Sequence, residues 1–127
     1  MILTKLKSYK WIKSKLNKKD KIGIVSCNAC ARMCGTGGEK ELKILSNRLR
    51  KDGYTVVDED LIGAPCMISQ LKKDELHGNK TIVLACVSGV YNLNKLFPKR
   101  KIIPALDTIG LAAVDNKGKP KLVKKLA

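Results

Sequence analysis

Residues 81–90 read Thr-Ile-Val-Leu-Ala-Cys-Val-Ser-Gly-Val, and this stretch decides which fold class the chain belongs to. Thr81 to Ala85 is nearly all apolar, which is typical of a strand buried on both faces of a parallel sheet. Ser88 can cap a helix whose apolar residues recur at helical spacing until Pro98. A buried strand that leads directly into a helix is the repeating unit of an α/β fold.

The same unit recurs on both sides of this stretch. Three further strands are predicted at Lys21–Ser26, Tyr54–Asp58 and Lys101–Leu106. Pro104 in the last of them favours an edge position, because proline cannot donate a ladder hydrogen bond. The expected architecture is therefore α/β: a small three-layer sandwich with a four-stranded, mainly parallel sheet in the order 2-1-3-4.

Two more helices are expected between these strands. The first begins at Thr36, where Thr36 and Glu39 have the spacing of a capping box, and Gly53 is placed to end it. Its buried face consists of leucines at helical spacing: Leu42, Leu45 and Leu49. The second begins at Pro65, a residue suited to the first turn of a helix, and runs roughly to Leu76.

Both ends of the chain are predicted to be basic additions to this domain. Residues 2–18 have the apolar spacing of an N-terminal amphipathic helix with lysines on its other faces. A turn at Asp115–Gly118 predicts a C-terminal hairpin. The expected division is a basic helix at 1–20, a cysteine-bearing α/β domain at 21–114, and a basic hairpin or tail at 115–127.

The charge is concentrated in those two ends. The chain has 26 basic and 11 acidic residues and a formal net charge of +15. Residues 1–21 carry +7 and residues 115–127 carry +4, so the 93 residues between them carry only +4. A nucleic-acid or anionic-surface binding module that uses the Lys-rich ends is thus an alternative function, but such dispersed charge more often serves solubility.

Composition excludes several classes of protein. A hydrophobic content of 44% excludes a disordered polycation, and the aromatic content of 4% weakens any scheme of base stacking on a single strand. The sequence contains no apolar run long enough for a transmembrane segment and no uninterrupted signal-peptide core. A soluble, cytoplasmic protein is expected.

The five cysteines follow the predicted strands. Cys27, Cys30 and Cys34 form a C-x2-C-x3-C motif after the first strand, Cys66 begins the helix after the second, and Cys86 follows the third. Ligand sites of open α/β sheets lie at the carboxyl ends of the strands. The cysteines are therefore expected to gather there.

Thiolates gathered at one edge repel each other unless a cation or cluster binds them. Both Zn²⁺ and a [4Fe–4S] cluster accept four thiolates, so the residue types alone do not separate them. Three close ligands and one remote ligand favour the cluster, with zinc as the alternative. The best four ligands are Cys27, Cys30, Cys34 and Cys86, and Cys66 is a fifth candidate able to replace one of them. Helix N-termini, and the cations Arg32 and Lys40, would offset the negative charge.

Other interpretations of these residues stay open. Cys27 and Cys30 could form a thioredoxin-like pair for thiol–disulfide exchange, or the five cysteines could be unrelated buried residues. Gly35 to Lys40 lacks the spacing of a phosphate-binding loop. His77 is expected at the surface near a helix end, and Asp107 is expected in a turn or a cap. No catalytic triad or carboxylate pair can be proposed, so catalytic activity is left undecided.

The ordered series of cysteine motifs resembles a known family. The series comprises Cys27-x2-Cys30-x3-Cys34 with Thr36-Gly37-Gly38-Glu39-Lys40-Glu41, Ala64-Pro65-Cys66, Leu84-Ala85-Cys86-Val87-Ser88-Gly89-Val90 and Pro104-Ala105-Leu106-Asp107-Thr108. It is similar to the first half of the small iron–sulfur/zinc subunit associated with bacterial methylenetetrahydrofolate reductase. The resemblance covers roughly residues 21–114 and all five cysteines.

The resemblance implies an accessory or electron-transfer subunit that carries a metal centre and supports a flavin-dependent reductase of one-carbon metabolism. A flavoprotein reductase subunit is the implied partner. Members of the family continue into a second cysteine-rich portion, whereas residues 115–127 of this chain contain no cysteine. The metal or cluster of that second portion is therefore not transferred to this chain, and neither is its part in assembly.

Overall fold

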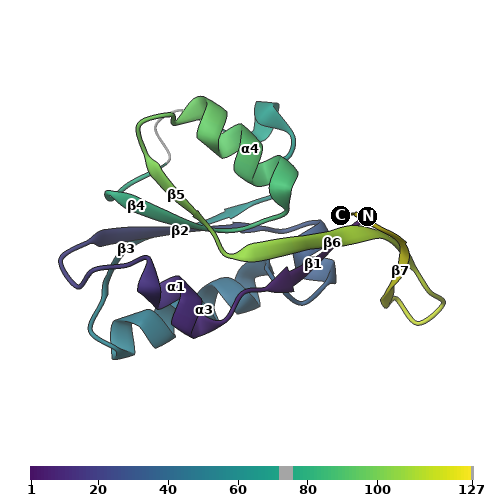
Figure 1. Ribbon diagram of the computed structural model, residues 1–127, viewed down its shortest axis with the longest axis horizontal. Helices are drawn as coiled ribbons and strands as arrows, with labels where there is room; N and C mark the ends of the chain where they lie inside the picture. The colour runs from purple at the N-terminus through teal and green to yellow at the C-terminus, as the bar shows by residue number, and fades with distance from the viewer. Residues whose placement is uncertain (72–75, 127) are drawn as a thin grey trace.

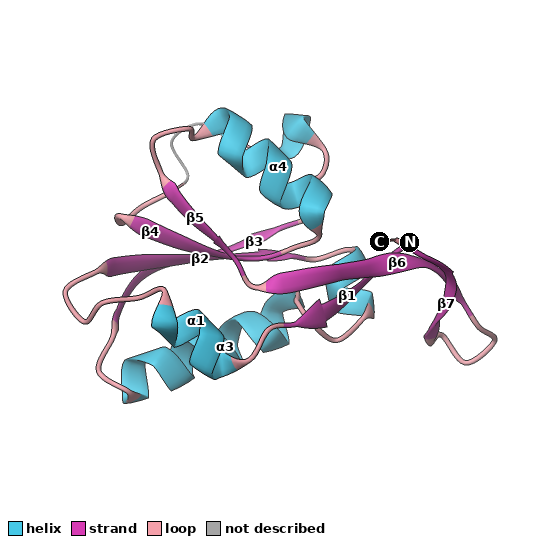
Figure 2. Cartoon of the chain, in the orientation of Figure 1, coloured by secondary structure: helices cyan, strands magenta, loops and turns pink. Residues whose placement is uncertain are grey.

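The computed structural model describes residues 1–71 and 76–126, which form two β-sheets with helices packed on the larger one (Figure 1, Figure 2). The larger sheet has four parallel strands in the order β3 (Thr55–Ile62), β2 (Lys21–Cys27), β4 (Lys80–Leu84) and β5 (Lys101–Pro104). The α/β class and the parallel sheet are confirmed. Numbered along the chain, the order is 3-2-4-5 and differs from the expected 2-1-3-4, since an unexpected strand at the N-terminus precedes these four.

The two inner strands supply the centre of the core. Every residue of β2 from Ile22 to Cys27 is buried, and so are the last four residues of β4. These strands are covered on both faces, which explains their continuous apolar sequences. Pro104 lies at the end of β5, an edge strand, as its missing N–H predicts.

Helices lie on both faces of this sheet. α1 (Tyr9–Ser14) and α3 (Gly38–Lys51) cover one face, and α4 (Val87–Leu96) covers the other (Figure 1). The predicted leucines of α3 are buried, and Gly53 follows its end with a φ of 90°. This conformation costs glycine nothing, which confirms its expected role at the end of the helix.

The predicted helix over residues 2–18 is wrong. Ile2–Leu6 form strand β1, and the helix α1 starts only at Tyr9. The Ser8 hydroxyl accepts a hydrogen bond from the Trp11 N–H at 3.1 Å, so Ser8 caps the helix and stops it from extending toward the N-terminus. Apolar residues four apart fall on one face in a strand as well as in a helix, which is why the spacing misled the prediction.

β1 belongs to a second, antiparallel sheet. Its order is β1-β6-β7, with β6 spanning Leu106–Val114 and β7 spanning Pro120–Lys125. The predicted C-terminal hairpin is confirmed: Asp115 Oδ1 accepts from the N–H groups of Lys117 and Lys119, both at 2.9 Å. The first strand of this hairpin, β6, extends back to Leu106. It pairs with β1 as well as β7, so the two ends of the chain share one sheet.

Three further local predictions are wrong. The helix expected from Pro65 is replaced by turns and a short 3-10 helix, η1 (Ile68–Gln70), while residues 72–75 of the predicted span lie outside the described residues. Thr36 does not cap α3, because Gly37 holds that position and the Thr36 hydroxyl bonds to Thr4 at 2.7 Å. Cys86, and not Ser88, occupies the cap position of α4.

An additional short helix, α2 (Cys30–Met33), follows β2 and was not predicted. In the part of the chain that the structure describes, no helix is long and apolar enough to cross a membrane.

Asp20 links the starts of β2 and β4. Its carboxylate accepts hydrogen bonds from Lys80 Nζ at 2.7 Å, Asn79 Nδ2 at 2.9 Å and the Asn17 N–H at 2.7 Å. Burial alone would raise the pKa of Asp20, but the hydrogen bonds outweigh that effect and hold the pKa below its ordinary value.

We expect Asp20→Asn to lower the free energy of unfolding by about 1.5–3 kcal/mol at neutral pH, the usual value of hydrogen bonds to a charged group. Because the folded pKa is the lower one, this contribution is present above the unfolded pKa of about 4 and disappears as the pH falls through the folded value. Urea denaturation from about pH 6 down to about pH 2 should show the variant and the parent converging at low pH. A constant difference would contradict this assignment.

Candidate metal centre

The parallel register brings the ends of three strands together. Cys27, the last residue of β2, lies opposite Ile62 at the end of β3. Ser26 lies opposite Leu84 at the end of β4, so the chain leaves β4 beside Cys27 and reaches Cys86 two residues later. Cys66 follows Ile62 by four residues. The carboxyl edge of the larger sheet therefore carries a cysteine at or just after each of these strands, as the sequence predicted.

Cys27 and Cys30 lie where β2 passes into α2. Cys27 is buried, and its sulfur accepts a hydrogen bond from the Ala29 N–H at 3.3 Å. Cys30 is the first residue of α2 and is half-buried. The Asn28 N–H donates to the Ile62 carbonyl at 2.8 Å, which ties this turn to the end of β3.

Cys34 points toward a different part of the molecule. It follows the last residue of α2, and its thiol donates to the Ile2 carbonyl of β1 at a sulfur–oxygen distance of 3.6 Å. This contact with the second sheet was not predicted, because the segment around Ile2 was expected to be helical.

Cys86 and Cys66 are held by α4. Cys86 is buried at the cap of α4, and the next N–H, that of Val87, donates to the Thr108 hydroxyl at 3.0 Å. The Asn92 side-chain amide donates to the carbonyls of Pro65 and Cys66 at 3.1 and 2.8 Å. Cys66 is exposed, but its backbone is thus fixed against the helix.

Asn92 and Thr108 position the cysteines, and neither role was predicted from the sequence. Asn92 acts on a loop 26 residues away. Nothing in the local sequence marks either contact. Only the packing of α4 and the start of β6 creates them.

The surroundings of Cys66 shift the pKa of its thiol. Burial raises the pKa of the Cys66 thiol, and the negative charges that Cys86, Cys27 and Cys30 can carry raise it further. We call Cys27, Cys30, Cys66 and Cys86, which lie at or after the carboxyl ends of β2, β3 and β4, the cysteine edge.

The thiols of the cysteine edge do not converge on one point as they stand. Among the described residues, no group of three or more His, Cys, Asp or Glu side chains has the geometry to hold a metal ion. The donor set consists of thiols, which suits zinc or an iron–sulfur cluster. Ligation would require at least some of these side chains to turn inward. Cys30 and Cys66 lie outside the strands and are only partly buried or exposed.

The other residues considered from the sequence are not part of the cysteine edge. His77 is exposed, as expected, but no helix ends beside it among the described residues. Asp107 is the second residue of β6 and forms an ion pair with Lys7, so its expected place in a turn or cap is wrong. Arg32 donates to the Asn28 carbonyl at 3.1 Å and supports the loop after β2, while Lys40 is exposed on α3.

Gly37 allows the loop after α2 to pass close to the cysteine edge. A Cβ atom at this position would lie 2.6 Å from the Ala31 Cβ, 3.1 Å from the Cys27 carbonyl oxygen and 3.2 Å from the Leu84 carbonyl oxygen. The last two atoms belong to the backbone of the strand ends. Only glycine fits here without moving them.

We therefore expect Gly37→Ala to lower the free energy of unfolding by about 1–3 kcal/mol through overpacking, measured by thermal or urea denaturation. Gly35→Asn is the matched control. Gly35 has a φ of 71°, which asparagine tolerates, and a Cβ atom added there would meet nothing within 4 Å. Equal losses in the two variants would contradict the role of close packing at Gly37.

Comparisons with models of protein families, with curated proteins and with solved structures returned no match for this chain. The likeness of its cysteine motifs to the reductase-associated family therefore stays a prediction.

Proposed function

We propose that the cysteine edge binds a [4Fe–4S] cluster, with Zn²⁺ as the alternative, and that the chain is an accessory protein of a redox enzyme. One observation carries this proposal: the register of β2, β3 and β4 brings cysteines from three separate segments to a single sheet edge. Such convergence from distant parts of the sequence is expected of a ligand site at the carboxyl ends of parallel strands.

Thiol chemistry supports a bound cation. Four thiolates cannot share a small region without a positive partner, since each raises the energy of the others. Zinc or a cluster core supplies that charge and binds thiolate directly.

The geometry favours one ligand set over the other. Cys66 lines one pocket with Val87, the neighbour of Cys86, and Asn92 of α4 holds its carbonyl, whereas the Cys34 thiol is engaged with the β1 backbone. We therefore propose Cys27, Cys30, Cys66 and Cys86 as the ligands, in place of the set with Cys34 that sequence spacing favoured.

The proposed partner is a flavin-dependent reductase of one-carbon metabolism, and this part rests on the family resemblance. Large apolar side chains are exposed directly after Cys66 and on α4, where Val87 and Tyr91 line one pocket with Cys66, and exposed apolar surface is typical of interaction sites. They are Met67, Ile68, Val87 and Tyr91, with exposed fractions of 53%, 46%, 63% and 64%. A metal centre surrounded by such a surface suits electron transfer to, or assembly with, a second protein.

Anaerobic purification followed by iron, sulfide and zinc analysis tests the metal centre. We expect about four iron and four sulfide per chain, or one zinc, according to the group bound. Cys66→Ser and Cys86→Ser should lose most of the bound metal. Cys34→Ser is the matched control and should retain it.

Metal-free, colourless and stably folded protein would contradict the proposal. Retention of metal by Cys66→Ser together with its loss from Cys34→Ser would restore the ligand set expected from spacing. Metal-free protein that turns over a disulfide substrate would instead support thiol–disulfide exchange at Cys27 and Cys30.

The partner is tested separately with the metal-loaded chain. Mixed with a flavin-containing methylenetetrahydrofolate reductase, it should elute as a complex whose absorbance includes both flavin and metal centre. Val87→Lys and Tyr91→Lys should weaken this complex without loss of metal. Failure to associate would contradict the proposed partner and leave the metal centre standing.

A further inference from the structure

α1 lies on the face of the larger sheet opposite α4 (Figure 1), and basic residues are concentrated in and around it. These residues come from α1, from the loop that follows, and from the carboxyl end of α3. We call this set the α1 basic face: Lys10, Lys13, Lys15, Lys18, Lys19, Arg48 and Lys51. Among the described residues of these segments, Asp52 is the one acidic residue that is exposed, so positive charge is in large excess.

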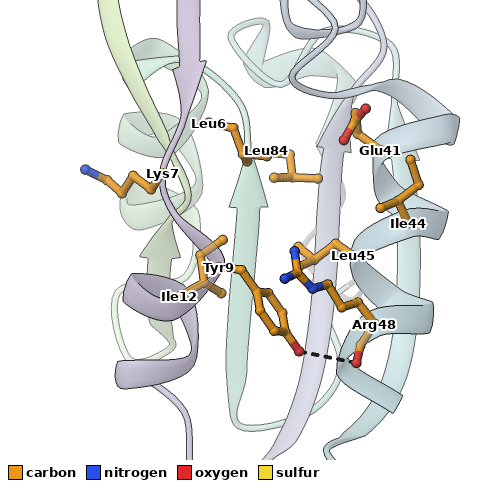
Figure 3. Close-up of a pocket in the computed structure, with 9 residues that line it drawn as sticks. All are labelled: Leu6, Lys7, Tyr9, Ile12, Glu41, Ile44, Leu45, Arg48 and Leu84. Atoms are coloured by element: carbon orange, nitrogen blue, oxygen red, sulfur yellow. Dashed lines mark hydrogen bonds between the residues drawn. The ribbon is translucent and has the colours of Figure 1, made fainter. Parts of the chain in front are cut away.

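Packing of α1 against α3 holds this surface in shape. The Tyr9 hydroxyl donates to the Arg48 carbonyl at 3.2 Å, as Figure 3 shows, and lies 2.6 Å from Asp52 Oδ2. Lys18 donates to the Asp52 carbonyl, and Lys13 Nζ lies 3.9 Å from Asp52 Oδ2. The end of α3 and the segment around α1 are thus joined into one surface.

Aromatic rings fix several of the cations. Lys13 and Arg48 lie over the Tyr9 ring, 4.7 and 3.8 Å from its centre. Lys18 lies 4.2 Å from the centre of the Tyr54 ring. Contacts between cations and aromatic faces restrict long side chains that would otherwise be mobile, which reduces the entropy lost when an anion binds.

Trp11 has the same arrangement on the other flank of α1. Lys7 and Lys15 lie over its ring, 4.7 and 5.4 Å from the centre. Because successive helical residues are about 100° apart, Tyr9 and Trp11 flank the exposed Lys10 on either side. The helix therefore presents Lys10 between two rings that are covered by other cations.

Part of the positive charge is not neutralised. Within the described residues, no acidic side chain pairs with Lys10, Lys19 or Lys51, and all three are exposed. Asp20, the acidic residue of the loop after α1, is buried and engaged with Lys80. The surface is thus suited to a polyanion.

The chemistry favours nucleic acid over a lipid surface. Ile12, on the inner side of α1, is 1% exposed and faces a cavity of about 80 Å³ lined also by Leu6, Leu45 and Leu84 (Figure 3). None of the large apolar side chains exposed in the described structure belongs to α1. A helix that lies on a membrane needs a free apolar face, and α1 has none.

The rings are also poorly placed for stacking on unpaired bases, because lysine and arginine side chains already occupy their faces. Charge without accessible rings suits the phosphate backbone, which proteins contact without reading sequence. We propose that the α1 basic face binds the phosphate backbone of a nucleic-acid duplex. This proposal is independent of the metal centre.

Fluorescence anisotropy with labelled 20-base-pair duplexes, one of DNA and one of RNA, tests the proposal and shows which duplex is preferred. For about five neutralised phosphates, the logarithm of the binding constant should fall against the logarithm of salt concentration with a slope of about −4.5. Trp11, the single tryptophan, should change its emission when the duplex binds.

Lys10→Gln combined with Lys51→Gln should reduce this slope by about 2 and weaken binding roughly tenfold or more near 0.1 M salt. Lys95→Gln combined with Lys99→Gln removes the same charge from exposed positions in and after α4, and should leave the affinity within about twofold of the parent. Circular dichroism melting should be unchanged in both, because all four side chains are exposed.

Equal weakening by the two double variants would overturn the proposal, since total charge and not the α1 basic face would then determine binding. Binding that does not depend on salt would overturn it too. So would tighter binding to phosphatidylserine vesicles or to polyglutamate than to both duplexes, because the natural partner would then be a membrane or an acidic protein.

Discussion

The parallel pairing of β2 with two neighbours is the constraint on which the rest of the structure depends. β2 forms its ladder with β3 on one side and β4 on the other, and it is buried from Ile22 to Cys27. In this register Cys27 lies opposite Ile62 and Ser26 lies opposite Leu84, so the carboxyl ends of all three strands meet at one edge of the sheet. The positions of the cysteines and of the helices that support them follow from that alignment.

The sequence predicted what depends on local pattern and burial. Continuous apolar runs marked β2 and β4, leucines at helical spacing marked α3, and a turn motif marked the terminal hairpin. It failed where long-range pairing outweighs local spacing. Residues 2–6 satisfy a helical period, yet β6 offers them a backbone partner and Ser8 caps the helix after them. The helix prediction for the segment after Pro65 failed because Asn92 of α4 binds the Pro65 carbonyl and holds this segment as a loop.

For the candidate site, too, the sequence predicted some features and missed others. Its position at the carboxyl edge follows from strand order and could be predicted from the sequence, and its four cysteines are among the five that the sequence singled out. The grouping of thiols could not be predicted, because the engagement of Cys34 with β1 depends on a strand that the pattern did not reveal. The two basic ends likewise seemed equivalent in composition, whereas the structure puts the N-terminal lysines of α1 beside α3 and the C-terminal lysines on a hairpin at the other end of the molecule (Figure 1).

The central claim is that the cysteines at the ends of β2, β3 and β4 bind a metal through their sulfur atoms. X-ray absorption at the iron or zinc edge of anaerobically purified protein tests it most directly, because this spectrum reports the ligand atoms. We predict a first shell made of sulfur alone at about 2.3 Å, with an additional iron–iron distance if a cluster is bound. A first shell of nitrogen or oxygen around the bound metal would contradict the account.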